Sequence, residues 1–236
     1  MSKRFNFKQF SISMDGCGMP VSTDGVLLGA WADASDCHDI LDIGCGTGLL
    51  SLMLAQRFPR AIITAIDIDE TAVKTTKDNV QQSPWQDRVS VLDADATAWE
   101  PDHRFEHVVC NPPYFTSGVQ ASSEQRATAR HHDTLSHQAL VKAIDRVLVT
   151  GGAASLILPV YEGENLIELA SGIGLGCRHK VSVKSTPAKP ASRLLIRLQK
   201  GLDANYRGDS TELVIQEGGK YTPEFVALTR DFYLKM

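Results

Sequence analysis

The sequence has few cysteines and no long hydrophobic run. Its five cysteines are scattered and never spaced as Cys-x-x-Cys, so neither a disulfide framework nor a zinc site is indicated. No stretch approaches the roughly 20 apolar residues that a membrane span needs, and the first residues lack the apolar centre of a secretion signal. We therefore expect a cytoplasmic protein with no membrane segment and no bound metal.

The chain also lacks internal repeats and low-complexity linkers. With 236 residues, of which 43% are hydrophobic and 22% charged, it can bury one large core. We expect a single domain over residues 1–236, with an N-terminal extension at about residues 1–35 and a basic C-terminal part at about residues 178–236. The sequence does not fix the oligomeric state, and a monomer is compatible with it.

Apolar stretches rich in β-branched residues alternate with longer periodic stretches along most of the chain. The expected strands are residues 40–43, 61–66, 89–92, 105–110, 154–158, 180–184 and 194–198. The expected helices are residues 49–58, 70–82, 136–149 and 164–173, the third of them stopped by Gly151 and Gly152. Such repeated units predict an α/β fold with a mostly parallel sheet, helices on both faces and antiparallel closing strands.

Positive charge is concentrated in one stretch of a chain whose net charge is −4. Residues 178–200 contain seven Lys or Arg residues and no acidic residue, so a stretch of +7 leaves −11 for the rest of the chain. This concentration favours an anionic partner such as a nucleic acid. The alternative is a solvated edge strand that lysines protect from aggregation.

A glycine-rich turn stands between the first expected strand and helix. Gly44, Gly46 and Gly48 give the pattern Gly-x-Gly-x-Gly, and Asp42 precedes them. Glycines let the backbone approach a ligand closely, and a carboxylate beside them suits a positively charged ligand better than a diphosphate. Dinucleotide-binding turns have the different pattern Gly-x-Gly-x-x-Gly. Ordinary turn chemistry stays open for the glycines alone.

Two further carboxylates follow the next expected strands. Asp67, which Ile68 follows, comes about 20 residues after the glycines, where nucleoside-binding α/β folds place a ribose acceptor. Asp95, which Ala96 follows, can accept a hydrogen bond from an adenine amine, or be a simple loop carboxylate. The three segments together resemble the cofactor-binding motifs of class I S-adenosylmethionine-dependent methyltransferases. The resemblance implies a Rossmann-like sheet of seven strands with S-adenosylmethionine lying across the strand ends.

The tetrad Asn111, Pro112, Pro113 and Tyr114 follows the fourth expected strand. Two prolines stiffen the turn, so the Asn111 side-chain oxygen and the Pro112 carbonyl can act as fixed hydrogen-bond acceptors, and Tyr114 offers a ring for stacking. Such a site suits a planar ring that bears an amine. The tetrad resembles the (Asn/Asp)-Pro-Pro-aromatic motif of amino methyltransferases, which also places Asn111 next to the cofactor. The alternative is an ordinary Pro-Pro turn.

A closer resemblance lies in the ends of the chain. The segments that carry it are residues 7–10, 23–32, 82–85, 111–115 and 221–234. They resemble the family of tRNA1(Val) adenine-N6 methyltransferases over residues 7–236. The resemblance implies methyl transfer to the N6 amine of the adenosine at position 37 of the tRNA. It also implies that the N-terminal extension closes over the cofactor through Thr23, Asp24 and Leu28.

Other acceptors stay open at this point. Release-factor glutamine methyltransferases also carry Asn-Pro-Pro-Tyr, so a protein amide is one alternative, and adenine in other RNA or in DNA is another. A non-catalytic cofactor-binding module is a third. For a tRNA substrate we expect phosphate contacts from basic side chains near the ends and beyond the tetrad. These residues are Lys3, Arg4, Lys8, Arg126, Arg130, Arg193 and Arg197.

Overall fold

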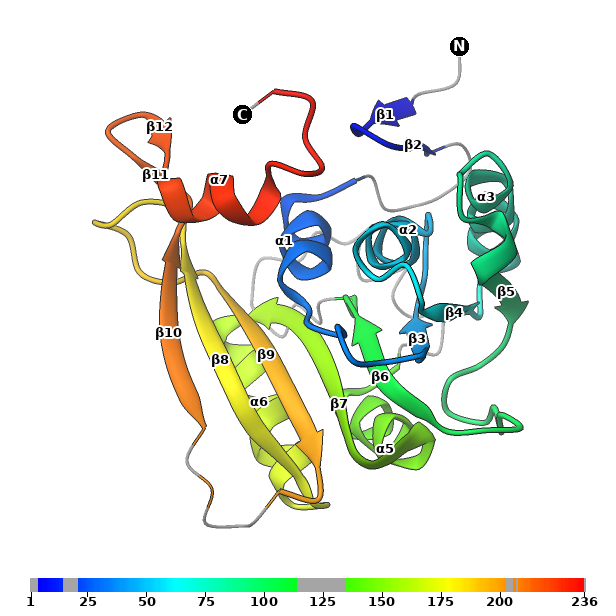
Figure 1. Cartoon of the computed structure of the whole chain (residues 1–236). Coiled ribbons are helices and arrows are strands. Elements are labelled where there is room, and N and C mark those ends of the chain that lie inside the picture. Colours follow the sequence, from blue (N-terminus) through cyan, green and yellow to red (C-terminus); the bar gives the residue numbers. More distant parts are fainter. Residues whose placement is uncertain (1–3, 15–20, 114–134, 203–205, 207, 236) are drawn as a thin grey trace, which may run out of the picture.

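The structure is a computed structural model that describes residues 4–14, 21–113, 135–202, 206 and 208–235. Its centre is a sheet of eight strands (Figure 1). In their order across the sheet these are β10 (Asp209–Val214), β8 (Leu175–Lys184), β9 (Arg193–Lys200), β7 (Leu148–Pro159), β6 (Phe105–Cys110), β3 (Asp39–Ile43), β4 (Ile62–Asp67) and β5 (Val89–Asp93).

Helices cover both faces of the sheet. They are α1 (Thr23–Trp31), α2 (Leu49–Arg57), α3 (Glu70–Gln81), α5 (His137–Val147), α6 (Val160–Ser171) and α7 (Pro223–Thr229), with a short 3-10 helix η1 (Gln86–Arg88). Side chains alternate between the faces along each strand, so Val108 and Cys110 of β6 pack with α5 and α6, whereas Val109 packs with α1 and α2. The α/β class with helices on both faces is thus confirmed.

The sheet differs from the expected one in two details: it has eight strands and not seven, and a single strand is reversed. The reversed strand is β9, which pairs antiparallel with both β7 and β8. It lies inside the sheet between these two strands, and the additional eighth strand β10 pairs in parallel with the far side of β8. Residues 209–212 of β10 are Asp, Ser, Thr and Glu, all exposed, so this strand has no apolar run that sequence reasoning could detect.

The expectation that two glycines stop the α5 helix is wrong. The helix ends at Val147, and β7 begins at Leu148 without an intervening loop. Gly151 and Gly152 lie inside β7, where Gly151 has a φ of 82°. The pairing between β6 and β7 is irregular there, so the glycines accommodate a break in strand register.

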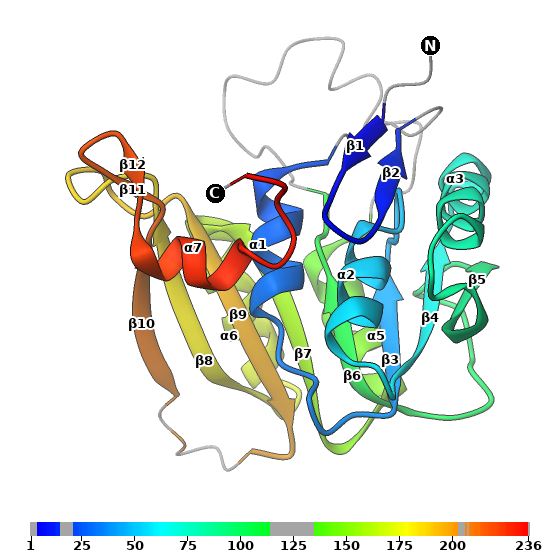
Figure 2. The ribbon, with the colours of Figure 1, turned by 45° about the horizontal axis from the view of Figure 1, so that its top comes forward.

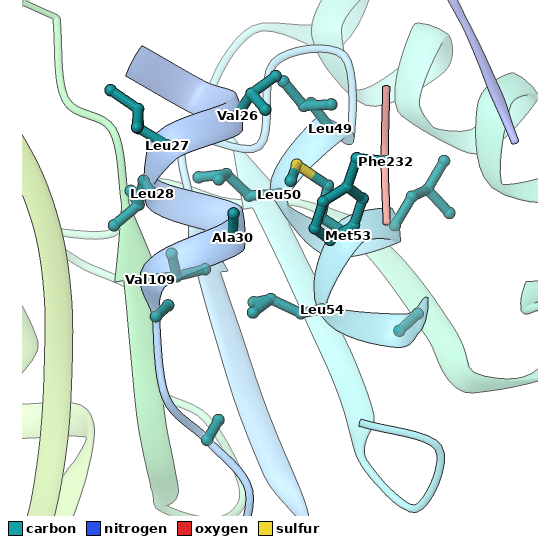
Figure 3. Close-up of a cluster of buried hydrophobic side chains, with 14 of the residues drawn as sticks. Val26, Leu27, Leu28, Ala30, Leu49, Leu50, Met53, Leu54, Val109 and Phe232 are labelled. Carbon is teal, nitrogen blue, oxygen red and sulfur yellow. The ribbon is translucent and has the colours of Figure 1, made fainter. Parts of the chain in front are cut away.

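The two ends of the chain pack against each other. The N-terminal hairpin consists of β1 (Arg4–Asn6) and β2 (Ser11–Ser13), and its Lys8 backbone N–H donates to the carbonyl oxygen of Phe232 at 2.9 Å. The rings of Phe5 and Phe7 lie 6.3 and 6.1 Å from the ring of Tyr233. Phe232 itself is buried beside Met53 of α2 (Figure 3). The last residues therefore form part of the core.

Candidate active site

The three glycines form a turn that only glycine fits without strain. Gly44, Gly46 and Gly48 have φ values of 70°, 56° and 78°, in the left-handed region. A Cβ atom on Gly48 would lie 2.8 Å from Cγ2 of Thr76, whereas a Cβ atom on Gly44 or Gly46 would meet nothing within 4 Å. The open space beside these two glycines suits a ligand that lies against the backbone.

Asp67 ties three strand ends together. Its Oδ2 accepts a hydrogen bond from the backbone N–H of Gly46 at 2.9 Å, and its Oδ1 accepts one from the backbone N–H of Asp69 at 3.0 Å. Its carbonyl oxygen accepts from the N–H of Ala94, which follows β5. The glycine turn and the ends of β4 and β5 therefore meet at this one residue.

The neighbours of Asp67 leave an apolar and an acidic surface uncovered. The side chain of Ile68 is 62% exposed, which is unusual for isoleucine. Asp95 is exposed, and its Oδ1 accepts from the backbone N–H and the Oγ1 of Thr97, both at 2.8 Å. The carbonyl oxygen of Ala96 accepts from Nη2 of Arg146 at 2.7 Å, which holds this loop on α5. The loop after β5 is thus fixed by its own hydrogen bonds.

Asp42 is fully buried behind the glycine turn. Its Oδ2 accepts hydrogen bonds from the backbone N–H and the Oγ of Ser51, at 3.1 and 2.6 Å, in the first turn of α2. Its Oδ1 has no hydrogen-bond partner among the described residues. Burial raises the pKa of Asp42 to about 7, although the bonds from Ser51 oppose the shift. A buried carboxylate oxygen is thus left to interact with a ligand.

The Asp42→Asn variant tests how much the burial of this carboxylate lowers the stability of the fold. The pKa of Asp42 is higher in the folded chain than in the unfolded chain, so the free energy of unfolding falls as the pH rises from 3.8 to about 7. The variant carries no charge there. We expect its free energy of unfolding to exceed that of wild type by about 4 kcal/mol at about pH 8 and to lie near that of wild type at about pH 4.

Urea unfolding at both pH values measures the difference. Asp36→Asn, which removes an exposed carboxylate, is the control and should match wild type at each pH. A stability gap between Asp42→Asn and wild type that is as large at pH 4 as at pH 8 would contradict this assignment.

Two residues of α3 that sequence reasoning missed hold the glycine turn in place. Oγ1 of Thr76 donates to the carbonyl oxygen of Gly46 at 2.8 Å, and Nδ2 of Asn79 donates to the carbonyl oxygen of Thr47 at 2.9 Å. Asn79 also bonds to the N–H and the carbonyl oxygen of Ser13 in the N-terminal hairpin. Both side chains are buried. Their spacing of three residues on the buried face of an amphipathic helix was the available signal.

Asn111 lies next to the glycine turn. It directly follows β6, whose last residue Cys110 pairs with Ile43, the last residue of β3. Pro112 is buried, Pro113 is exposed and Asn111 is half-buried. The side chain that sequence reasoning assigned to the acceptor amine is therefore at the same strand ends as the cofactor motifs. Tyr114, together with Lys3, Arg126 and Arg130, lies outside the described residues.

The N-terminal residues assigned to the cofactor occupy different environments. Thr23 is exposed at the start of α1, next to Ser22, whose Oγ caps the helix by accepting from the N–H of Gly25 at 3.1 Å. Asp24 is half-buried and pairs with Arg193. Leu28 is fully buried in the core. Leu28 therefore packs between helix and sheet, and the expectation that it borders the cofactor gains no support from its position.

Carboxylates within the chain match most of the charge of the basic stretch at residues 178–200. Five of its seven cations form ion pairs with acidic side chains. The pairs are Lys180 with Glu164, Lys184 with Glu212, Arg193 with Asp24, Arg197 with Asp33, and Lys200 with Asp145. The Arg178 guanidinium lies 5.4 Å from the ring centre of Tyr206.

Four of the side chains expected to contact phosphates have partners within the chain instead. Arg193 and Arg197 hold α1 and the residues after it against β9, with N–O distances of 2.8 and 3.3 Å. Near the N-terminus, Arg4 donates to Oε1 of Gln82, and Nζ of Lys8 donates to the carbonyl oxygen of Arg230. Each of the four therefore has a structural role within the chain, which sequence reasoning could not detect.

The described part of the chain has neither a metal-binding cluster nor a membrane-spanning helix. No group of three or more His, Cys, Asp or Glu side chains in this part of the chain could hold a metal ion. No helix in the same residues has the length and apolar character that crossing a membrane requires.

Comparison with solved structures supports the fold. The chain is similar to a predicted O-methyltransferase from Agrobacterium tumefaciens, with a TM-score of 0.68, 24% identity, and coverage of 89% of this chain and 96% of that one. It is also similar to the N-methyltransferase NodS from Bradyrhizobium japonicum, solved with S-adenosyl-L-homocysteine, with a TM-score of 0.52, 16% identity, and coverage of 76% and 85%. These likenesses show the methyltransferase fold.

Sequence comparison defines the family. Residues 26–159 match the family model of the methyltransferase small domain. The chain is 51% identical to the tRNA1(Val) (adenine(37)-N6)-methyltransferase of Vibrio cholerae serotype O1, over all of this chain and 97% of that one. It is 47% identical to the enzyme of the same name from Photobacterium profundum, over the whole of both chains. The chain therefore belongs to the family of tRNA1(Val) (adenine(37)-N6)-methyltransferases.

Proposed function

We propose that this chain transfers the methyl group of S-adenosylmethionine to the exocyclic N6 amine of adenosine 37 in tRNA1(Val). The observation that carries the proposal is the meeting of Asn111 with the glycine turn and Asp67 at the carboxyl ends of adjacent parallel strands. Relatives that carry this name match the chain over its full length, which favours adenosine over a protein amide as the acceptor.

The residues at the strand ends fit S-adenosylmethionine. The uncovered sides of Gly44 and Gly46 can receive it against the backbone. An ionised carboxylate offers about four acceptor positions, so Asp67 retains capacity for ribose hydroxyls beyond its two backbone bonds. Ile68 offers an apolar face, and Asp95 a further acceptor. The unpartnered Oδ1 of Asp42 suits the cationic methionine end.

The proposed chemistry depends on position. When bound, the cofactor supplies a methyl group on a sulfonium, which is a good leaving group, so the chain needs no strong base. The Asn111 side-chain oxygen and the Pro112 carbonyl accept the two N–H bonds of the amine, which turns its lone pair toward the methyl group. They also stabilise the positive charge that grows on the nitrogen. Holding the reactants in line can lower the barrier by about 7–11 kcal/mol.

The N-terminal part is proposed to belong to the same unit as the sheet. The hydrogen bonds of Ser13 with Asn79, and of Asn79 with Thr47, connect the hairpin to the cofactor turn. This connection supports one methyltransferase domain over residues 1–236 whose first 35 residues or so border the cofactor. A monomer in the cytoplasm, where tRNA is modified, completes the proposal.

Incubation with labelled S-adenosylmethionine tests the function. Parallel reactions receive bulk tRNA, tRNA1(Val), tRNA1(Val) with guanosine at position 37, and a protein fraction that contains release factors. We expect label in the first two, recovered as N6-methyladenosine after digestion, and none in the other two. Label in the protein fraction alone would replace the proposal by glutamine methylation, and label in the position 37 variant would place the target elsewhere in the tRNA.

A further inference from the structure

Two segments that follow the outer strands β8 and β10 lie at the same end of the sheet as the proposed active site. Because β9 is antiparallel to both β7 and β8, the strand β8 runs in the direction of β7, β6 and β3, and β10 runs parallel to β8. The residues that follow β8 and β10 therefore lie at the same end of the sheet as Asn111 and the glycine turn, beyond the carboxyl ends of the parallel strands (Figure 2). The strand β10, which the sequence did not predict, thus ends on the side of the sheet where Asn111 lies.

These two segments lie side by side. The loop of residues 185–192 follows β8, and a hairpin of β11 (Gln216–Glu217) and β12 (Lys220–Tyr221) follows β10. The backbone N–H groups of Ile215 and Gln216 donate to the carbonyl oxygens of Lys184 and Ser185, at 2.9 and 3.1 Å. Figures 1 and 2 both show the loop and the hairpin next to each other, near the start of α7.

The loop and the hairpin carry cations that the rest of the chain does not neutralise. Lys189 and Lys220 are exposed, and neither side chain has an ion pair or hydrogen bond with the described residues. Glu217 faces Lys220 across the hairpin but lies beyond ion-pair distance. The two lysines thus differ from the five paired cations of the basic stretch.

An exposed aromatic ring lies beside Lys220. Tyr221 is 48% exposed, and its ring stacks on that of Phe225 with 4.9 Å between the centroids and 30° between the planes. Phe225 is buried, so it fixes one face of the tyrosine ring and leaves the outer part of Tyr221 in solvent. Fixed aromatic rings between lysines are a recurring way to bind nucleic-acid bases and phosphates together.

We propose that the 185–192 loop and the β11–β12 hairpin form an RNA-docking surface in which Lys189 and Lys220 contact phosphates and Tyr221 stacks on a base or ribose. The proposal rests on the tRNA substrate proposed above. Four strand spacings separate β6 from β10, roughly 19 Å at about 4.8 Å each. The surface is therefore placed to hold the tRNA about six stacked nucleotides from the reacting adenosine.

A double Lys189→Ala, Lys220→Ala variant tests the phosphate contacts. We expect its KM for tRNA to rise about tenfold, and the slope of log binding constant against log salt to flatten by about 1.5–2. Cofactor affinity and kcat at saturating tRNA should stay at wild-type values. Arg104→Ala is the matched control. Arg104 is exposed and unpaired among the described residues, but it precedes β6 and so lies at the opposite end of the strands from Asn111.

Tyr221→Leu separates stacking from charge. Leucine keeps apolar contact with Phe225, and we expect weaker tRNA binding with the salt slope of wild type. Unchanged KM and salt slope in the lysine variant, or equal losses in Arg104→Ala, would overturn the docking surface. Equilibrium binding of tRNA in the presence of S-adenosylhomocysteine keeps this test separate from catalysis. Wild-type chain that binds tRNA at this surface but transfers no methyl group would refute the proposed function alone.

Discussion

Replacing Asn111 with alanine is expected to lower kcat for methyl transfer about 100- to 1,000-fold while S-adenosylmethionine still binds. The magnitude is that of removing one preorganised hydrogen-bonding group from a site that stabilises charge in the transition state. Alanine leaves the Pro112 carbonyl as a single fixed acceptor, so the amine can rotate away from the methyl group. The four residues of β6 before Asn111, residues 107–110, pair with both β3 and β7, so the backbone of the site should survive the change.

Single-turnover transfer to tRNA measures this effect, and calorimetry measures cofactor binding. Asn111→Asp, which keeps an acceptor oxygen, should retain more activity than Asn111→Ala. Asn165→Ala on the surface of α6 is the matched control and should match wild type in both assays. Transfer by Asn111→Ala within threefold of wild type would remove Asn111 from the proposed mechanism.

Replacing Asp67 with alanine is expected to weaken S-adenosylmethionine binding about 10- to 100-fold. Hydrogen bonds to a charged group contribute about 1.5–3 kcal/mol each, and the variant loses those proposed to the ribose hydroxyls. It also leaves the N–H groups of Gly46 and Asp69 without their acceptor, so the glycine turn keeps only the hydrogen bonds of Gly44 and Cys45 to the Ile66 carbonyl as its connection to β4. Both effects raise the Kd of the cofactor.

Calorimetric titration with S-adenosylhomocysteine gives the Kd without turnover. Asp69→Ala is the matched control, because it removes a neighbouring carboxylate that caps α3 by accepting from the N–H of Thr71. It should cost about 1 kcal/mol of stability and leave the Kd near wild type. Asp67→Glu should restore most of the affinity. Equal affinities of Asp67→Ala and wild type would exclude Asp67 from the cofactor site.

Strongly apolar elements were predictable from the sequence. The predicted β6 strand, residues 105–110, has the bounds found in the structure, and the predicted strands at β3, β4 and β5 differ from the observed bounds by one residue at either end. Most of their apolar side chains are buried between two helical layers, with Ile62 and Leu92 as exposed exceptions, so local pattern and tertiary environment largely agree. The glycine turn, Asp67 and Asn111 were found because they follow directly on those strands.

The remaining features depend on contacts between distant parts of the chain. Asp24 and Arg193 are 169 positions apart, so no local pattern could show that this arginine is paired. The strand β10 is polar and exposed, and only its pairing with β8 makes it a strand. Asn79 was missed for a related reason, because its partners Ser13 and Thr47 lie on two other elements.

The packing of the two chain ends has a consequence for biosynthesis. The hairpin residues Phe5, Phe7 and Lys8 are made more than 200 residues before their partners Phe232 and Tyr233. The sheet from β3 to β7 can form while synthesis continues, whereas the hairpin finds these contacts only after residues 232 and 233 have been made. Because Asn79 connects that hairpin to the glycine turn, a chain that lacks Phe232 and Tyr233 would hold the hairpin, and with it one contact of the proposed cofactor turn, less firmly.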